Sequence, residues 1–116
     1  MSQTVKLTAS FLGLKFLPPS FGIGSNSINP KLILHDDEME YRVFKTNSVS
    51  YSDIEQVDIF LFYKTTNLLL TRNDLILTFG GNLNDKAKLA EVLQFLASKG
   101  CRMTEKALRF MQADEA

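Results

Sequence analysis

The spacing of apolar residues changes once along this chain. From Lys31 to Phe79 they recur in short runs, mostly at every second position, and polar turns separate the runs. From Asp85 to Ser98 they recur at every third or fourth position. The first pattern predicts β-strands and the second predicts an amphipathic helix. Strands followed by a helix indicate a mainly β (α+β) architecture, an antiparallel barrel or sandwich with a helical cap.

The expected strands are separated by Gly, Asn, Asp and Pro residues, which favour turns. They cover residues 5–17, 31–35, 39–44, 49–51, 54–63, 68–71 and 75–79. Residues 18–30 form a loop that is rich in Gly, Ser, Asn and Pro. Within 39–44, Met39, Tyr41 and Val43 alternate with Glu40, Arg42 and Phe44. This alternation is typical of a hairpin strand with one buried face.

The helical segment has recognisable ends. Asn84 or Asp85 is suited to cap its first turn, and Gly100 is suited to end it with a positive φ. Its apolar face comprises Leu89, Val92, Leu93 and Leu96. A second, short helix is expected over residues 104–112 after a Thr104 cap.

Length and composition favour one globular domain. The chain has 116 residues, 45% of them hydrophobic, and no linker divides it, so residues 1–116 are expected to form a single domain. The 13 basic and 13 acidic residues give no net charge. No dense Lys/Arg cluster is present, which argues against nucleic acid as a partner.

Two of the expected strands are apolar on both faces. Ile59, Leu61 and Tyr63 would share one face of strand 54–63, and Phe60 and Phe62 the other. Leu68, Leu69 and Leu70 likewise make both faces of their strand apolar. Either another part of this chain covers the outer face, or Phe60, Phe62 and Leu69 form an interface with a second copy or another protein. Both alternatives stay open at this point.

The sequence offers little chemistry. His35, the single histidine, precedes Asp36 and Asp37, but a base or metal site needs further ligands, and a solvated turn is the simpler interpretation. No serine lies in a Gly-x-Ser-x-Gly turn, and Gly22–Ser27 lacks the features of a phosphate-binding loop. Cys101, the single cysteine, excludes an internal disulfide. We therefore expect no enzyme activity, catalytic residue, metal or cofactor.

The N-terminal segment is apolar but short. Lys15 interrupts it and Pro18-Pro19 ends it, so it does not reach the roughly 18 apolar residues of a membrane span. A cytoplasmic protein is the expectation. Insertion of this segment at a membrane surface is the alternative, although Lys6 and Lys15 provide little attraction to headgroups.

One stretch resembles a known family. Val49-Ser50-Tyr51-Ser52-Asp53-Ile54-Glu55-Gln56-Val57 is similar to the apolar-x-Tyr-x-Asp-Ile-x-x-Val stretch of bacterial pleckstrin-homology-like and GRAM-like domains. The order of elements over residues 31–99 is also similar. The resemblance implies about seven antiparallel strands in a barrel or sandwich that is plugged by a C-terminal helix.

The resemblance also implies a binding or assembly role without catalysis. Relatives that bind phosphoinositides carry several basic residues around the first hairpin, whereas the matching turn here is His35-Asp36-Asp37-Glu38. Carboxylates repel phosphate, so a phosphoinositide ligand is disfavoured. The expected function is a protein-interaction or self-assembly module.

Overall fold

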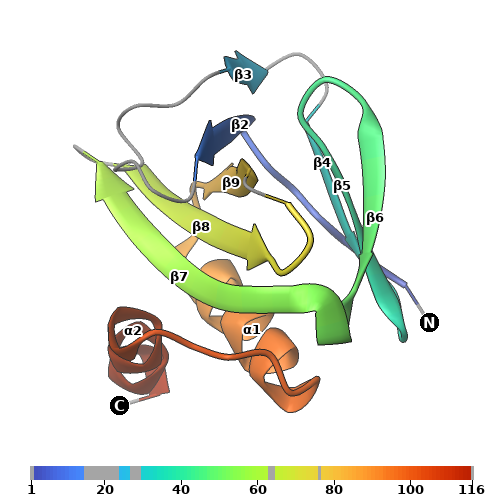
Figure 1. Cartoon of the computed structure of the whole chain (residues 1–116). Coiled ribbons are helices and arrows are strands. Elements are labelled where there is room, and N and C mark those ends of the chain that lie inside the picture. Colours follow the sequence, from blue (N-terminus) through green and yellow to red (C-terminus); the bar gives the residue numbers. More distant parts are fainter. Residues whose placement is uncertain (1, 15–23, 27–29, 63–64, 76, 116) are drawn as a thin grey trace.

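The computed structural model describes residues 2–14, 24–26, 30–62, 65–75 and 77–115. These residues form two antiparallel sheets and two C-terminal helices (Figure 1). The first sheet has the order β1-β4-β5-β6, with β1 (Gln3–Val5), β4 (Lys31–Leu34), β5 (Glu38–Arg42) and β6 (Thr46–Ser50). The second has the order β3-β2-β9-β8-β7, with β2 (Ala9–Leu14), β3 (Gly24–Asn26), β7 (Ile54–Phe62), β8 (Thr65–Arg72) and β9 (Leu77–Leu83).

The mainly β prediction is therefore confirmed. Of the two expected architectures, barrel or sandwich, the described strands form two separate sheets and not a closed barrel, and they number nine rather than about seven. The expected strand over residues 5–17 is two strands, β1 and β2, which belong to different sheets, while residues 15–17 lie outside the described residues.

The glycine pair Gly80-Gly81 was expected to end the last strand, yet β9 continues through both residues to Leu83. The reason lies on the outer face of the five-stranded sheet, the face turned away from the four-stranded sheet. A Cβ added to Gly80 would lie 2.1 Å from Cζ of Phe11, so the Phe11 ring occupies the space that this glycine leaves empty.

The inner faces of both sheets share one core with the helices. Met39 and Tyr41 of β5 enter this core from one sheet, and Leu68, Leu70 and Phe79 from the other. The rings of Tyr41 and Phe79 contact each other across the sandwich, with centroids 4.7 Å apart and planes tilted by 43°.

Helix α1 (Lys86–Ser98) begins after Asp85, whose side chain accepts a hydrogen bond from the Lys88 amide. Its expected apolar face is buried in the same core, with Leu89, Val92, Leu93 and Leu96 at most 1% exposed. Gly100 follows with a φ of 87°, as its position predicted.

Helix α2 (Glu105–Glu115) is joined to the sheet through residues 102–104. The Val57 amide of β7 donates to the Arg102 carbonyl (2.7 Å), and the Thr104 amide donates to the Val57 carbonyl (3.0 Å). The Thr104 hydroxyl donates to Asp58 Oδ1 (2.7 Å) and accepts from the Ala107 amide (3.2 Å). Residues 102–104 therefore cover part of the outer edge of β7, and Thr104 caps α2 as expected.

Candidate binding site

The candidate interface predicted from the sequence comprises Phe60, Phe62 and Leu69, and its described side chains are buried or half-buried. Leu69 is 8% exposed but lies outside the core cluster, as expected for a residue on the outer face. Its direct neighbour across the ladder is Gly80, over which the Phe11 ring lies. Phe60 is half-buried, and the Phe62 side chain lies outside the described residues. The intramolecular alternative therefore accounts for Leu69, whereas Phe60 keeps partial exposure.

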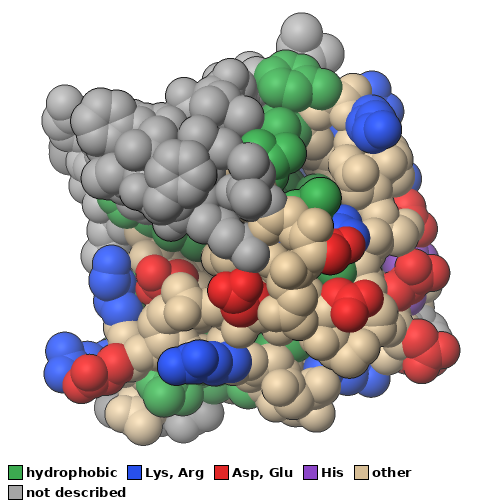
Figure 2. Space-filling view, viewed as in Figure 1, with side chains coloured by type: hydrophobic (Ala, Val, Ile, Leu, Met, Phe, Trp, Pro, Cys, Tyr) green, Lys and Arg blue, Asp and Glu red, His purple; other side chains and the backbone are tan. Residues whose placement is uncertain are grey.

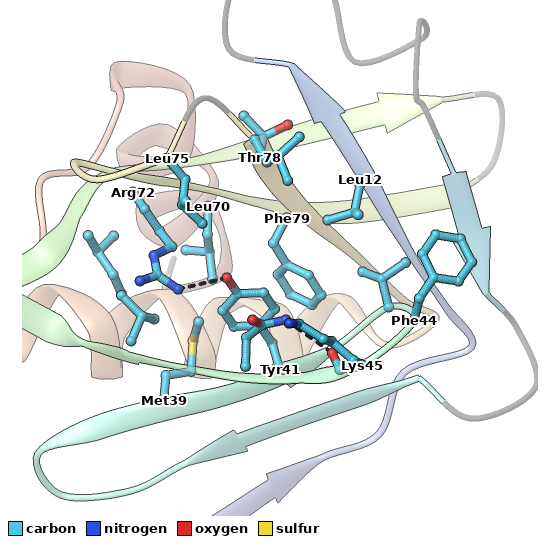
Figure 3. Close-up of a pocket in the computed structure, with 15 residues that line it drawn as sticks. Leu12, Met39, Tyr41, Phe44, Lys45, Leu70, Arg72, Leu75, Thr78 and Phe79 are labelled. Carbon is cyan, nitrogen blue, oxygen red and sulfur yellow. Dashed lines mark hydrogen bonds between the residues drawn. The ribbon is translucent and has the colours of Figure 1, made fainter.

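A more open apolar site lies between the two sheets. It is a cavity of about 170 Å³, and none of its lining residues comes from α1 or α2. We call it the mouth cavity. Its apolar lining comprises Leu12, Met39, Tyr41, Val43, Phe44, Val49, Ile54, Leu70, Leu75, Leu77 and Phe79. Figure 3 shows Tyr41 and Phe79 projecting toward each other from opposite sheets, with Leu12 and Phe44 beside them.

The border of the mouth cavity exposes large apolar side chains. Phe44 is 59% exposed and Leu75 is 38% exposed, which makes them two of the three exposed large hydrophobic side chains among the described residues. Both line the same cavity, although they come from different turns, β5–β6 and β8–β9. Figure 2 shows hydrophobic side chains gathered at the top of the molecule with a basic side chain beside them.

Arg72 and Lys45 are the charged residues among those that line the cavity. Arg72 forms a two-bond ion pair with Asp74, through Nε to Oδ1 (2.8 Å) and Nη2 to Oδ2 (2.7 Å). This pair raises the pKa of the guanidinium. Arg72 Nη1 also donates to Tyr41 Oη at 3.0 Å, so this side chain is held in place across the sandwich (Figure 3).

Lys45 is in a different situation. Its backbone carbonyl accepts from Asn47 Nδ2 (3.1 Å), but its ammonium group has no hydrogen-bond or ion-pair partner among the described residues. The side chain is exposed at the same turn as Phe44. The cavity border thus combines apolar surface with one cation that is available to a ligand.

Sequence reasoning missed this site, although one signal pointed to it. Phe44 continues the polar side of the alternation in strand 39–44, after Glu40 and Arg42. An apolar ring on the solvent side of a hairpin strand is the informative exception to the pattern. The cavity itself depends on contacts between residues distant in sequence, such as Tyr41 and Phe79, which no local pattern contains.

His35 is not isolated, contrary to the solvated turn that the sequence suggested. Its Nε2 lies 2.7 Å from Glu40 Oε1, and its Nδ1 lies 2.6 Å from Ser2 Oγ. The hydrogen bond from His35, followed by that from Lys31, lowers the pKa of Glu40. A serine, a histidine and a glutamate joined by hydrogen bonds are the residue types of a hydrolytic triad.

Catalysis would further require a substrate cavity and oxyanion donors beside Ser2. None of the three residues lines the mouth cavity, nor the second cavity, which lies beside the start of α1 and includes Thr4, Lys6 and Lys88. The described residues contain no group of three or more His, Cys, Asp or Glu side chains that could hold a metal ion. Asp36 and Asp37 thus belong to no such group among the residues that the structure describes.

Cys101 is 7% exposed, and burial raises the pKa of its thiol. A nucleophilic cysteine needs the opposite shift, because the thiolate is the reactive form. This residue is therefore part of the core, where its thiol lies 3.7 Å from the Tyr51 carbonyl oxygen.

No protein-family model matches this chain, and no match was found among curated proteins. Within the part of the chain that the structure describes, no helix combines the length and the apolar character needed to cross a membrane.

Proposed function

We propose that this protein is a non-enzymatic protein-interaction module of pleckstrin-homology-like fold, and that the mouth cavity is its recognition site. One observation carries the proposal: Phe44 and Leu75 are exposed at the border of a cavity that is lined mainly by apolar side chains. The pleckstrin-homology-like assignment is supported by the two antiparallel sheets and by α1, whose apolar face is buried in the core that the sheets share.

The volume of the cavity favours one apolar side chain as the group it accepts. Pockets for drug-sized ligands measure about 300–1,000 Å³, whereas an engineered cavity of about 150 Å³ binds benzene. The mouth cavity, at about 170 Å³, is close to the smaller value. A leucine, methionine or phenylalanine side chain from a partner therefore matches it better than a large ligand does.

A single buried side chain is not enough for stable binding. Burial of a Leu or Phe side chain is worth about 1.5–3 kcal/mol, and association costs at least about 4 kcal/mol in lost freedom of movement. The additional contact area has to come from the surface around the cavity. Phe44 and Leu75 provide that surface, which favours a polypeptide partner over a small apolar molecule.

A second candidate, self-association through the outer face of the five-stranded sheet, is supported by the partial exposure of Phe60. The membrane alternative has less support, because Val5 and Leu7 of the apolar N-terminal segment are at most 8% exposed and belong to the core. Their side chains therefore pack within this chain and are not exposed for contact with lipid.

Selection from a random heptapeptide library displayed on phage tests the proposal. Wild type is the target, and the Phe44→Ser/Leu75→Ser variant is used for counter-selection. We expect peptides with a Phe, Leu or Met that bind wild type and fail to bind Leu12→Phe, in which the larger ring fills part of the cavity. Phe60→Ser is the control that retains binding. Peptides that bind all variants equally would contradict the proposal.

A further inference from the structure

We infer that the partner segment carries a carboxylate next to the apolar side chain that enters the mouth cavity. The inference rests on the proposed function and adds the chemistry of the partner. It commits to an acidic polypeptide segment as the occupant.

The charges at the mouth cavity support a carboxylate. Among the described residues that line it, Lys45 and Arg72 are basic and none is Asp or Glu. The guanidinium of Arg72 is largely neutralised, because Asp74 accepts two hydrogen bonds from it. The Lys45 ammonium has no hydrogen-bond or ion-pair partner among the described residues. An anionic group of the partner complements this cation, and a second cation would be repelled.

The position of Lys45 places this charge next to the apolar contact. Lys45 directly follows Phe44, and both line the cavity from the β5–β6 turn. A partner residue inside the cavity therefore has its sequence neighbours close to that turn. Because an extended chain advances only about 3.3 Å per residue, an acidic residue one or two positions away stays near the cavity and is able to reach the ammonium group at the end of the long Lys45 side chain.

The edge of β6 provides a further constraint on how the partner binds. β6 is the last strand of the four-stranded sheet, and such an edge is a common site for strand addition. Here Arg72 Nη1 lies 3.4 Å from the Ser48 carbonyl of this strand and occupies part of the edge. Insertion of a side chain into the cavity is therefore favoured over extension of the sheet by the partner.

A charge-reversal experiment tests the inference. The same heptapeptide library is selected in parallel on wild type, on Lys45→Glu and on Lys86→Glu. Lys86 is an exposed lysine at the start of α1 and is not among the residues that line the cavity, so it controls for net charge. We expect wild type and Lys86→Glu to enrich an apolar residue next to Asp or Glu. Lys45→Glu should lose the acidic preference and enrich Lys or Arg at that position.

A synthetic peptide from the wild-type selection then measures the contribution of the carboxylate. Exchange of its Asp for Asn, or Glu for Gln, should weaken binding to wild type about two- to fivefold at low salt, the range of an exposed ion pair. The difference should shrink as salt rises from about 50 mM to about 500 mM, because salt screens exposed charges. Binding to Lys45→Glu should instead be strengthened by this exchange, because the new acidic side chain repels the carboxylate of the peptide.

The outcomes separate the inference from the proposed function. Apolar peptides without an acidic preference, or an acidic preference that Lys45→Glu retains, overturn the inference and leave the recognition site intact. Peptides that bind Leu12→Phe and Phe44→Ser/Leu75→Ser as well as they bind wild type overturn both the inference and the proposed function. If the Phe44→Ser/Leu75→Ser variant converts a dimer to a monomer without any peptide, a second copy occupies the mouth cavity, and the acidic partner is excluded.

Discussion

Arg72 and Tyr41 join the two sheets at the cavity border, because Nη1 of Arg72 on β8 donates to Oη of Tyr41 on β5 at 3.0 Å. The same tyrosine ring packs on Phe79 of the five-stranded sheet. Tyr41 is 4% exposed, so its hydroxyl group depends on this partner more than on water. The hydrogen bond and the ring contact together fix the separation of the sheets where the cavity lies.

A double-mutant cycle measures this link. Tyr41→Phe keeps the ring contact and removes the acceptor, so we expect a loss of about 1 kcal/mol in the free energy of unfolding. Arg72→Met also removes the ion pair with Asp74 and should cost about 1–3 kcal/mol. The double variant should cost less than the sum by about 0.5–1 kcal/mol. Urea unfolding gives all four values, and additive losses would show that the two side chains are not coupled.

The contact between Phe11 and Gly80 predicts that substitutions at these two positions are energetically coupled on the outer face of the five-stranded sheet. Gly80→Ala places a Cβ within the space of the Phe11 ring, and such overpacking costs about 1–3 kcal/mol. Phe11→Ala should recover part of this loss in the double variant. Gly81→Ala is the matched control, because its nearest neighbour is the flexible end of Leu7 at 3.1 Å and should move aside more easily. Thermal unfolding of the four variants decides, and equal losses at both glycines would contradict the contact.

Thr104 is predicted to determine the stability of α2. Thr104→Val keeps the shape of the side chain and removes the hydroxyl group that bonds to Asp58 and caps Ala107. Loss of a cap costs about 0.5–2 kcal/mol, and Thr104→Ser should restore most of it. Amide hydrogen exchange is the suitable measurement. Protection should fall in α2 and at Val57 before it falls in α1, and a uniform decrease would argue against a local role.

The buried hydroxyl group of Tyr51 is expected to make the free energy of unfolding depend on pH in the alkaline range. Burial is the main cause that raises the pKa of its hydroxyl group to about 12. The same hydroxyl group donates a hydrogen bond to the His35 carbonyl at 2.6 Å. The unfolded chain ionises near pH 10, so the stabilisation is complete below that pH and is lost as the pH rises through 12. The slope approaches about 1.4 kcal/mol per pH unit within this window. Tyr51→Phe should remove this slope, and the same slope in both proteins would exclude Tyr51 as its source.

Ser2 is predicted to be unreactive as a nucleophile, although it lies beside His35. A fluorophosphonate probe, which labels activated serines, should leave this protein unmodified under conditions that label a control serine hydrolase. Intact mass measurement is the readout. Labelling that disappears in both Ser2→Ala and His35→Ala would refute the proposal of a non-enzymatic protein.

The parts of the fold that were predictable have strong local patterns. Leu89, Val92, Leu93 and Leu96 show helical spacing, and Asp85 and Gly100 mark the ends of that helix. The pairing of residues 31–34 with 39–42 was also foreseeable from the alternation of the hairpin. In each case, contacts between residues close in sequence determine the structure.

The parts that could not be predicted depend on distant contacts. The apolar run from Val5 onward gives no sign that β1 and β2 pair in different sheets, because both strands have the same alternation. Gly80 was expected to stop a strand, but its role is to admit the ring of Phe11, which lies far away in sequence. The mouth cavity likewise requires two sheets to meet, and its border is marked in the sequence only by Phe44 on the polar side of a strand.

The short pairing of residues 102–104 with β7 has a consequence for the whole chain. Truncation before Arg102 would leave the amide and carbonyl groups of Val57 unpaired on a strand that carries Phe60. Exposed strand edges of this kind are templates for growth into fibrils. Residues 102–104, held in place by the helix that follows them, therefore protect the molecule from cross-β aggregation, and loss of the chain after Gly100 by proteolysis should remove that protection.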